Sequence, residues 1–160
     1  MSHDHGVLPP SECVLRYVLD RFAASQPDKV FAVFEGGISW TYRELQREVR
    51  GAAAALQALG VTQGDHVLVW MPPGRDGLKT WFAANYCGAV CVPINTAYRG
   101  RVLEHVVANS DAEVAVVHAE LAPRLADIDT ARLKRIVILG GEADAIDGLD
   151  ILPAAALGAP

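Results

Sequence analysis

The hydrophobic positions of the chain follow two spacings. Apolar residues three and four apart predict amphipathic helices, and short runs of consecutive apolar residues predict strands buried on both faces. The first helix is expected over 14–22, with Ser11 as a residue of the N-cap type in front of it and Pro27 behind it. The remaining pattern predicts helices over 45–59, 78–86, 102–107 and, with less regular spacing, 121–133, and strands over 66–71, 89–94, 113–118 and 135–139.

Local signals mark the boundaries of several of these elements. Thr41 and Glu44 have the spacing of a capping box, which predicts that a helix begins at this point, and Gly60 is expected to end that helix. Two runs rich in β-branched and aromatic residues, 30–34 and 38–40, flank a Glu-Gly-Gly segment. They predict a small β-hairpin, because glycine readily adopts the positive φ angles of a tight turn.

The succession of strands and helices indicates the fold class. Strands that are apolar on both faces and alternate with helices are typical of a parallel sheet covered by helices. The sequence therefore predicts an α/β fold, a mostly parallel sheet with flanking helices plus a small β-hairpin. We expect a flexible tail over 1–10, one partial domain over 11–139 and a connector over 140–160, where the pattern dissolves into Gly, Ala, Asp and Pro.

Composition and charge exclude several classes of protein. The 160 residues are 51% hydrophobic and 21% charged, which is typical of a single globular domain or a piece of one. With 14 Lys and Arg against 19 Asp and Glu, the formal charge is -5, and no basic surface is expected that would bind nucleic acid. Three cysteines indicate a reducing compartment. The start has no apolar core of a signal peptide, and the apolar runs fall short of the roughly 20 residues of a membrane span, so a cytoplasmic location is expected.

Ligands of open parallel sheets bind where the strands end, so the loops after Met71, Ile94, His118 and Leu139 are the expected site. These loops contain neither the glycine-rich dinucleotide fingerprint nor a P-loop. The glycine pair 140–141 is followed by acidic residues, whose charge would repel a phosphate. The residues alone therefore predict no phosphate-binding loop.

Other residue types capable of chemistry are better explained by structural roles. Cys87 and Cys91 fit small buried thiols, and Ser110-Asp111 fits a helix end and turn better than part of a triad with His118. Arg75-Asp76 fits a helix N-terminus with a favourable acid. We therefore assign no catalytic, cofactor-binding or metal-ligating residue; the histidines considered and set aside for a metal site are His3, His5, His66, His105 and His118.

Three segments, in order, resemble the opening motifs of the adenylate-forming acyl-CoA synthetases, the AMP-binding ligases. They are Trp40-Thr41-Tyr42-Arg43-Glu44-Leu45, then 59–67 (LGVTQGDHV), then 88–95 (GAVCVPIN), and the resemblance covers about residues 20–140. The segment 95–100 (NTAYRG) is similar to the carnitine/crotonobetaine-CoA and fatty-acid-CoA ligase type. Tyr86-Cys87 and Pro72-Pro73-Gly74 depart from the usual pattern, which disfavours an amino-acid-adenylating module and leaves the acyl substrate open.

The resemblance implies a two-step reaction. A carboxylate attacks the α-phosphorus of MgATP to give acyl-AMP and pyrophosphate, and the thiol of coenzyme A then displaces AMP. In this family the phosphate donors lie on a Ser/Thr/Gly-rich loop that ends in lysine, and no segment of this sequence matches that loop. We therefore expect the N-terminal part of a longer ligase, which on its own is inactive and holds no ATP, Mg²⁺ or coenzyme A.

Two alternatives to a ligase fragment stay open at this point. One is a stand-alone α/β binding module of flavodoxin-like build, and the other is a partner that completes a split ligase. A partial sheet also exposes apolar surface, which favours self-association, and Trp81, Phe82 and Val106 are the candidates to contribute to it.

Overall fold

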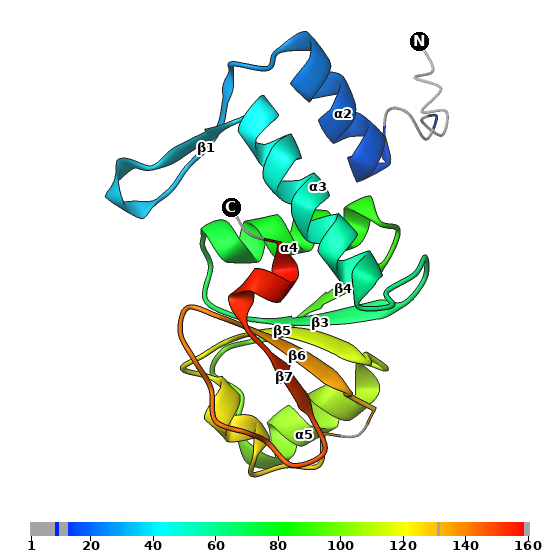
Figure 1. The fold of residues 1–160 in the computed structure, drawn as a ribbon, viewed down its shortest axis with the longest axis vertical. Coiled ribbons are helices and arrows are strands. Elements are labelled where there is room, and N and C mark those ends of the chain that lie inside the picture. Colours follow the sequence, from blue (N-terminus) through cyan, green and yellow to red (C-terminus); the bar gives the residue numbers. More distant parts are fainter. Residues whose placement is uncertain (1–8, 10–12, 131, 159–160) are drawn as a thin grey trace, which may run out of the picture. The chain divides into compact units, whose positions relative to one another are not determined.

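The computed structural model describes residues 9, 13–130 and 132–158, and the chain divides into two compact units, Met1–Gln46 and Arg47–Pro160. Of the predicted tail over 1–10, only Pro9 lies within the described residues, and His3, His5 and Ser11 lie outside them. Figure 1 shows the following elements: α2 Leu15–Ser25, β1 Val30–Val33, β2 Ser39–Thr41, α3 Tyr42–Ala58, β3 His66–Trp70, α4 Arg75–Tyr86, β4 Val90–Pro93, α5 Gly100–Asn109, β5 Val114–His118, β6 Arg135–Leu139 and β7 Asp150–Leu152, with short 3₁₀ turns at Glu35–Gly37, Ala122–Leu125 and Ala154–Leu157.

The first unit contains α2 and the predicted hairpin. Strands β1 and β2 pair in an antiparallel sheet, and both glycines of the turn between them have positive φ, as expected. The aromatic rings of Phe34 and Trp40 pack edge to face at 5.0 Å across the two sides of the turn. Val14, not Ser11, directly precedes α2, and its side chain makes no capping hydrogen bond.

The capping box at the start of α3 has the predicted geometry. The backbone N–H and the hydroxyl of Thr41 both donate to Glu44 Oε2 at 2.8 Å, and the Glu44 N–H donates to Thr41 Oγ1 at 3.3 Å. This reciprocal bonding satisfies donors that the first helical turn leaves without partners. The helix ends at Ala58, and the chain reverses at Gly60, so both predicted ends are confirmed.

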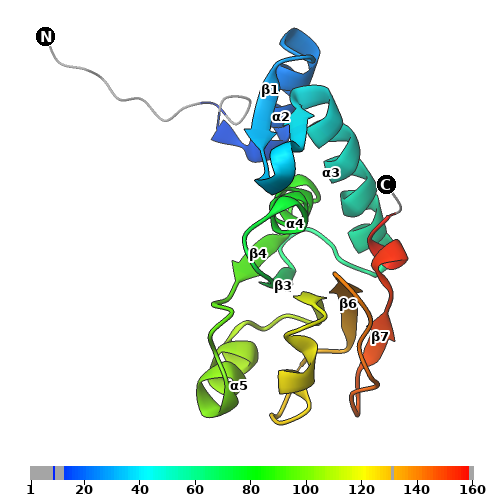
Figure 2. The same ribbon diagram turned by 90° about the vertical axis from the view of Figure 1, so that its left-hand side faces the viewer.

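The second unit contains a five-stranded parallel sheet in the order β4-β3-β5-β6-β7. Figures 1 and 2 show α4 and α5 on opposite faces of this sheet. Alternate residues of β3 serve the two faces: Val67 and Val69 pack with the cluster that includes α4, and Leu68 and Trp70 pack with the cluster that includes α5. The α/β fold with a parallel sheet and flanking helices is confirmed.

Two parts of the second unit differ from the prediction. Instead of a helix over 121–133, the described residues there contain only the 3₁₀ turn Ala122–Leu125, because Pro123 supports a helix start but prevents an upstream helix from continuing through it. Residues 140–160, expected as a connector, contain β7 and the 3₁₀ turn that buries Leu157. The strand was missed because only three residues pair, beside a Gly- and Asp-rich segment.

The two edge strands are β4 and β7, and a proline lies at the carboxyl end of each. Pro93 is the last residue of β4, and Pro153 directly follows β7. The N–H groups of Val90 and Ile94 point to the neighbouring β3 side, where they donate to Asp65 and Val69 carbonyls. Since backbone N–H groups alternate in direction along a strand, those at positions 91 and 93 of β4 point away from β3, and within β4 only Cys91 offers an N–H to an added strand, because proline has none.

Candidate functional site

The strand order places a switch point between β3 and β5. From β3 the chain passes through α4 to β4 on one side, and then returns through α5 to β5 on the other side of β3. In open parallel sheets, ligands bind in the crevice outside the carboxyl ends of strands where the connections diverge in this way. The carboxyl edge of the sheet is therefore the candidate functional site.

A groove of about 310 Å³ opens at this edge, between α4 and the ends of β3 and β4. Its lining is almost entirely apolar, and it includes Trp81, whose surface is 40% exposed. Such a lining suits the hydrocarbon part of a small ligand better than a charged group. The lining residues are Val69, Met71, Pro72, Pro73, Gly74, Gly77, Leu78, Trp81, Cys91, Pro93 and Ile94.

The described part of the carboxyl edge does not fit the phosphates of a nucleotide. Gly140 has a φ of +77°, and a Cβ atom at this position would collide with the ring of His118, so this ring lies directly against the glycine. Glu120 follows β5, and Glu142 follows the glycine pair after β6. These carboxylates oppose an anion, and we derive no step through a bound nucleotide from these residues.

The turn after β4, residues Asn95–Tyr98, is held by side chains from neighbouring strand ends. Trp70 is fully buried at the end of β3, and its indole Nε1–H donates to the Asn95 carbonyl at 3.1 Å. Arg124 Nη1, from the segment after β5, donates to the Thr96 carbonyl at 2.6 Å and to the Tyr98 carbonyl at 3.5 Å. Its guanidinium also lies 5.8 Å from the centre of the Trp70 ring.

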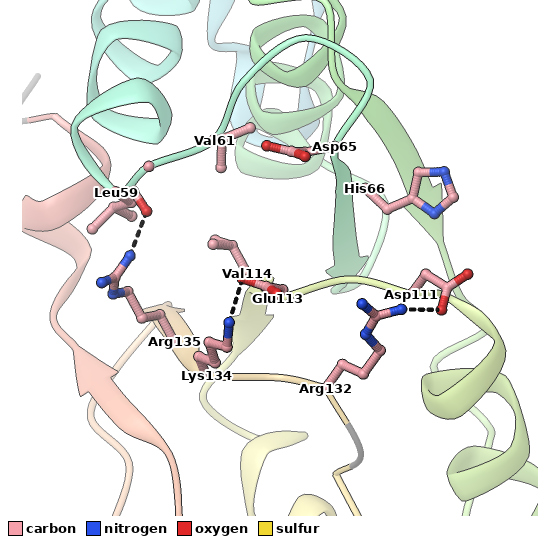
Figure 3. Close-up of a pocket in the computed structure, with 11 residues that line it drawn as sticks. Leu59, Val61, Asp65, His66, Asp111, Glu113, Val114, Arg132, Lys134 and Arg135 are labelled. Carbon is pink, nitrogen blue, oxygen red and sulfur yellow. Dashed lines mark hydrogen bonds and ion pairs between the residues drawn. The ribbon is translucent and has the colours of Figure 1, made fainter.

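The opposite, amino edge of the sheet has a crevice of about 250 Å³, drawn in Figure 3. Charged side chains line it, and they pair with one another: Arg132 with Asp111 at 3.0 Å, and Lys134 with Glu113 at 2.7 Å. Arg135 Nη1 donates to the Leu59 carbonyl at 2.6 Å. The complete lining is Leu59, Gly60, Val61, Asp65, His66, Asp111, Glu113, Val114, Arg132, Lys134 and Arg135.

Two polar residues of this crevice support the entry into β3. Asp65 Oδ2 accepts hydrogen bonds from the Thr62 N–H at 2.7 Å and from the Thr62 hydroxyl at 2.8 Å, and these bonds lower the pKa of the Asp65 carboxyl. His66 Nδ1 lies 2.6 Å from the Ser110 carbonyl oxygen. The hydrogen bonds of these groups stabilise the turn before β3 and the start of that strand, so we assign the crevice a structural role.

Two cysteines are half-buried: Cys91 lines the groove, and Cys87 lies at the end of α4. Burial raises the pKa of Cys91 to about 11, and burial also raises the pKa of Cys87. Both are free cysteines and stay protonated at neutral pH, which disfavours nucleophilic chemistry or metal binding by a thiolate.

The structure separates the remaining candidate residues. Ser110 and Asp111 precede β5 whereas His118 ends it, so they lie at opposite edges of the sheet. His66 begins β3, and His105 lies on α5, where its ring nitrogens lie near Asn109 Nδ2. Across 13–130 and 132–158, no group of three His, Cys, Asp or Glu side chains could hold a metal ion.

Arg75 and Asp76 begin α4, as the sequence predicts. Asp76 pairs with Lys79 at 3.4 Å within the first turn, and its carbonyl accepts the buried Thr80 hydroxyl. This is the structural role expected for an acid at a helix N-terminus. Sequence reasoning missed Trp70 and Arg124, since a side chain that bonds to backbone carbonyls 25 to 28 residues away leaves no local pattern.

None of the helices in the described part of the chain is long and apolar enough to cross a membrane. Comparison with known proteins then places the chain. A feruloyl-CoA synthase from Amycolatopsis is 40% identical over 116 residues, which cover 72% of this chain and 23% of that protein. A crotonobetaine/carnitine–CoA ligase from Salmonella paratyphi A is 28% identical over 144 residues, covering 86% of this chain and 28% of the ligase.

The fold agrees with these relatives. A crystal structure of a long-chain-fatty-acid-CoA ligase from Archaeoglobus fulgidus superposes with a TM-score of 0.70 at 28% identity, over 83% of this chain and 28% of that one. The chain thus spans about a quarter of the length of the relatives it matches. The family model for AMP-binding enzymes matches residues 19–156. The chain belongs to the AMP-binding enzyme family.

Proposed function

We propose that the whole protein is an ATP-dependent ligase that joins a carboxylic acid to coenzyme A. The observation that carries this proposal is the 40% identity to a feruloyl-CoA synthase over 72% of the chain. The crotonobetaine/carnitine–CoA ligase and the fatty-acid-CoA ligase support the same reaction class with different acids. Because these relatives are named for different acids, the proposal specifies the reaction class and not one acid.

The proposed reaction has two steps. The carboxylate oxygen attacks the α-phosphorus of MgATP, which forms a mixed anhydride, acyl-AMP, and releases pyrophosphate. The thiol sulfur of coenzyme A then attacks the acyl carbon, loses its proton and displaces AMP. Activation is required because a free carboxylate is a poor electrophile, and Mg²⁺ with positioned donors stabilises charge on the phosphates.

Within this proposal, this chain provides part of the enzyme's scaffold and the apolar wall of a groove, and it provides no donors to the phosphates. The groove at the carboxyl edge is lined by apolar residues. After β6, the ring of His118 lies against Gly140. We therefore expect the isolated 160-residue chain to form no adenylate.

The test uses the protein produced from its complete reading frame. ATP–pyrophosphate exchange and coenzyme A thioester formation are measured with ferulate, crotonobetaine and palmitate, and at least one acid is expected to support both steps. The 160-residue chain is the matched control and is expected to stay at background. Failure of every acid with the complete protein would overturn the proposed reaction, and exchange by the short chain would overturn the scaffold role.

We also propose a cytoplasmic location and self-association through apolar surface. The odd number of cysteines in the sequence, three, supports a reducing compartment. Of the candidate residues for self-association, Trp81 is 40% exposed, Val106 is partly buried and Phe82 is buried. Trp81 and the 55% exposed Val102 therefore support the proposal better than Phe82. A size that does not change with concentration in light scattering would exclude this association.

The alternatives from the sequence receive no support from these relatives. The strand order β4-β3-β5-β6-β7 does match the flavodoxin-like order, in which the first strand lies second in the sheet. A shared order indicates fold alone, and the relatives reported above are ligases. Neither a stand-alone binding module nor a split partner is proposed.

A further inference from the structure

We propose that Arg124 is a positioning residue of the ligase reaction, which holds the Asn95–Tyr98 turn so that the groove at the carboxyl edge keeps its shape for the carboxylic acid. This inference rests on the proposed function. It concerns the half-buried guanidinium of Arg124, which lines neither of the two cavities described above.

The contacts of Arg124 join three neighbouring strand ends. The residue follows β5, it lies over the ring of Trp70 at the end of β3, and it bonds to the carbonyls of the turn that follows β4. Since β3 lies between β4 and β5 in the sheet, the side chain spans the switch point. An arginine suits this role, because Nη1 carries two N–H groups that can donate to two carbonyls while the planar guanidinium lies over the Trp70 ring.

The turn itself is closed by its own hydrogen bonds. Asn95 Oδ1 accepts the Ala97 N–H at 2.8 Å, and the Asn95 carbonyl accepts the Tyr98 N–H at 3.1 Å. Trp70 and Arg124 provide the contacts of this turn with other strand ends, through the carbonyls of Asn95, Thr96 and Tyr98. Tyr98 also packs against the apolar cluster on the α5 face, so without Arg124 the turn loses the hydrogen bonds at the Thr96 and Tyr98 carbonyls and keeps this packing.

The turn is continuous with the groove wall. Pro93 and Ile94 line the groove and directly precede Asn95, so a shift of the turn moves that wall. Small displacements of positioning groups lower kcat/KM, and a wall that contacts the acid equally in ground and transition states acts mainly on KM. The expected signature of a lost Arg124 is therefore a raised KM for the acid with little change in kcat.

The test compares Arg124→Met with Arg135→Met in the protein produced from its complete reading frame. Both arginines donate from Nη1 to a backbone carbonyl at 2.6 Å, but Arg135 does so at the amino edge, so the second variant controls for loss of a bond of the same kind. Hydrogen exchange is followed over a peptide containing 94–99, and steady-state kinetics use whichever of ferulate, crotonobetaine or palmitate the unaltered protein converts.

For Arg124→Met we expect exchange in 94–99 to become about tenfold faster. We expect KM for the acid to rise about tenfold, with kcat changed by less than about threefold. Arg124→Lys should have a KM between those of the unaltered protein and Arg124→Met, because an ammonium can donate to a carbonyl but lacks the planar group that lies over the Trp70 ring. Arg135→Met should leave the KM and the exchange of this peptide unchanged.

Three results would overturn the inference: unchanged exchange in Arg124→Met, faster exchange with an unchanged KM, or an equal rise of KM in Arg135→Met. An unaltered protein that converts none of the acids would instead overturn the proposed function on which the inference rests. An active protein whose Arg124→Met variant keeps its KM overturns the inference alone.

Discussion

The two edges of the parallel sheet differ in the side chains that line their cavities: charged residues line the crevice at the amino edge, and apolar residues line the groove at the carboxyl edge. The amino edge gathers the charged side chains, but they pair with each other or bond to backbone at strand entries. At the carboxyl edge, a groove lined almost entirely by apolar residues lies beside a turn that Trp70 and Arg124 hold by hydrogen bonds. Exposed paired charges of this kind stabilise a sheet weakly, and the apolar groove is the larger of the two cavities.

The largest effect on stability is expected for Trp70, whose buried ring lies at the carboxyl end of β3. Trp70→Ala should lower the free energy of unfolding by about 3–5 kcal/mol, because it leaves a cavity between β3 and the α5 face and removes one of the two hydrogen bonds to the Asn95 carbonyl. Urea unfolding measures the loss. The half-exposed Trp81 is the matched control, and Trp81→Ala should cost clearly less; equal losses would contradict the assignment of Trp70 to the core.

A somewhat smaller effect is expected after β6. Gly140→Ala should lower the free energy of unfolding by about 2–4 kcal/mol, from the unfavourable φ of +77° and from the collision with His118. Gly148 has a φ of +76° with no atom within 4 Å of an added Cβ, so Gly148→Ala reports the cost of φ alone. The double variant Gly140→Ala/His118→Ala should approach that value. Equal costs for the two single variants would show that the His118 contact is not tight.

A pH-dependent effect is expected at the amino edge. The hydrogen bonds from Thr62 lower the pKa of Asp65 in the folded state, so ionised Asp65 stabilises the fold above its unfolded pKa, near 3.8. That contribution is lost as the pH falls through the lower folded pKa. Asp65→Asn should therefore be less stable than the unaltered chain at pH 7, and the difference should shrink below about pH 4. A difference that is constant from pH 7 to pH 2 would contradict this role.

The smallest effect is expected for the exposed ion pairs of the amino edge. Lys134→Met and Asp111→Asn should each change the free energy of unfolding by less than about 1 kcal/mol, because water screens both partners. The effect should diminish further in 1 M salt, which thermal unfolding at two salt concentrations can measure. A loss above about 2 kcal/mol would show that the amino edge is energetically as important as the carboxyl edge.

Elements with a strong local signal could be predicted from the sequence. The Thr41–Glu44 capping box and the Glu-Gly-Gly hairpin turn both have the expected geometry, since each depends on residues three to five positions apart. Strands β3, β5 and β6 could be predicted because their residues are apolar on both faces.

Features that depend on distant residues could not be predicted. The 121–133 helix was wrong because weak apolar spacing outweighed the signal of Pro123. The pattern also predicted β4 as a buried strand, but β4 is an edge strand, and Val90 is 45% exposed. Strand order decides burial here, and it depends on pairings between segments up to several tens of residues apart. The hydrogen bonds of Arg124 could not be predicted for the same reason, because they join residues 26 and 28 positions apart.

The Thr62–Asp65 turn repeats the hydrogen bonds of the Thr41–Glu44 box, yet a strand follows one and a helix follows the other. In both cases a threonine N–H and hydroxyl donate to one carboxylate oxygen three residues later. Gly64, with a φ of +89°, lies inside the second turn and redirects the backbone. In this chain, a threonine and an acid at this spacing therefore precede two different kinds of element, and the turn with a glycine at its third position leads into the strand. Designers who transplant such a tetrapeptide to start a helix must therefore choose its third position as carefully as its first and fourth.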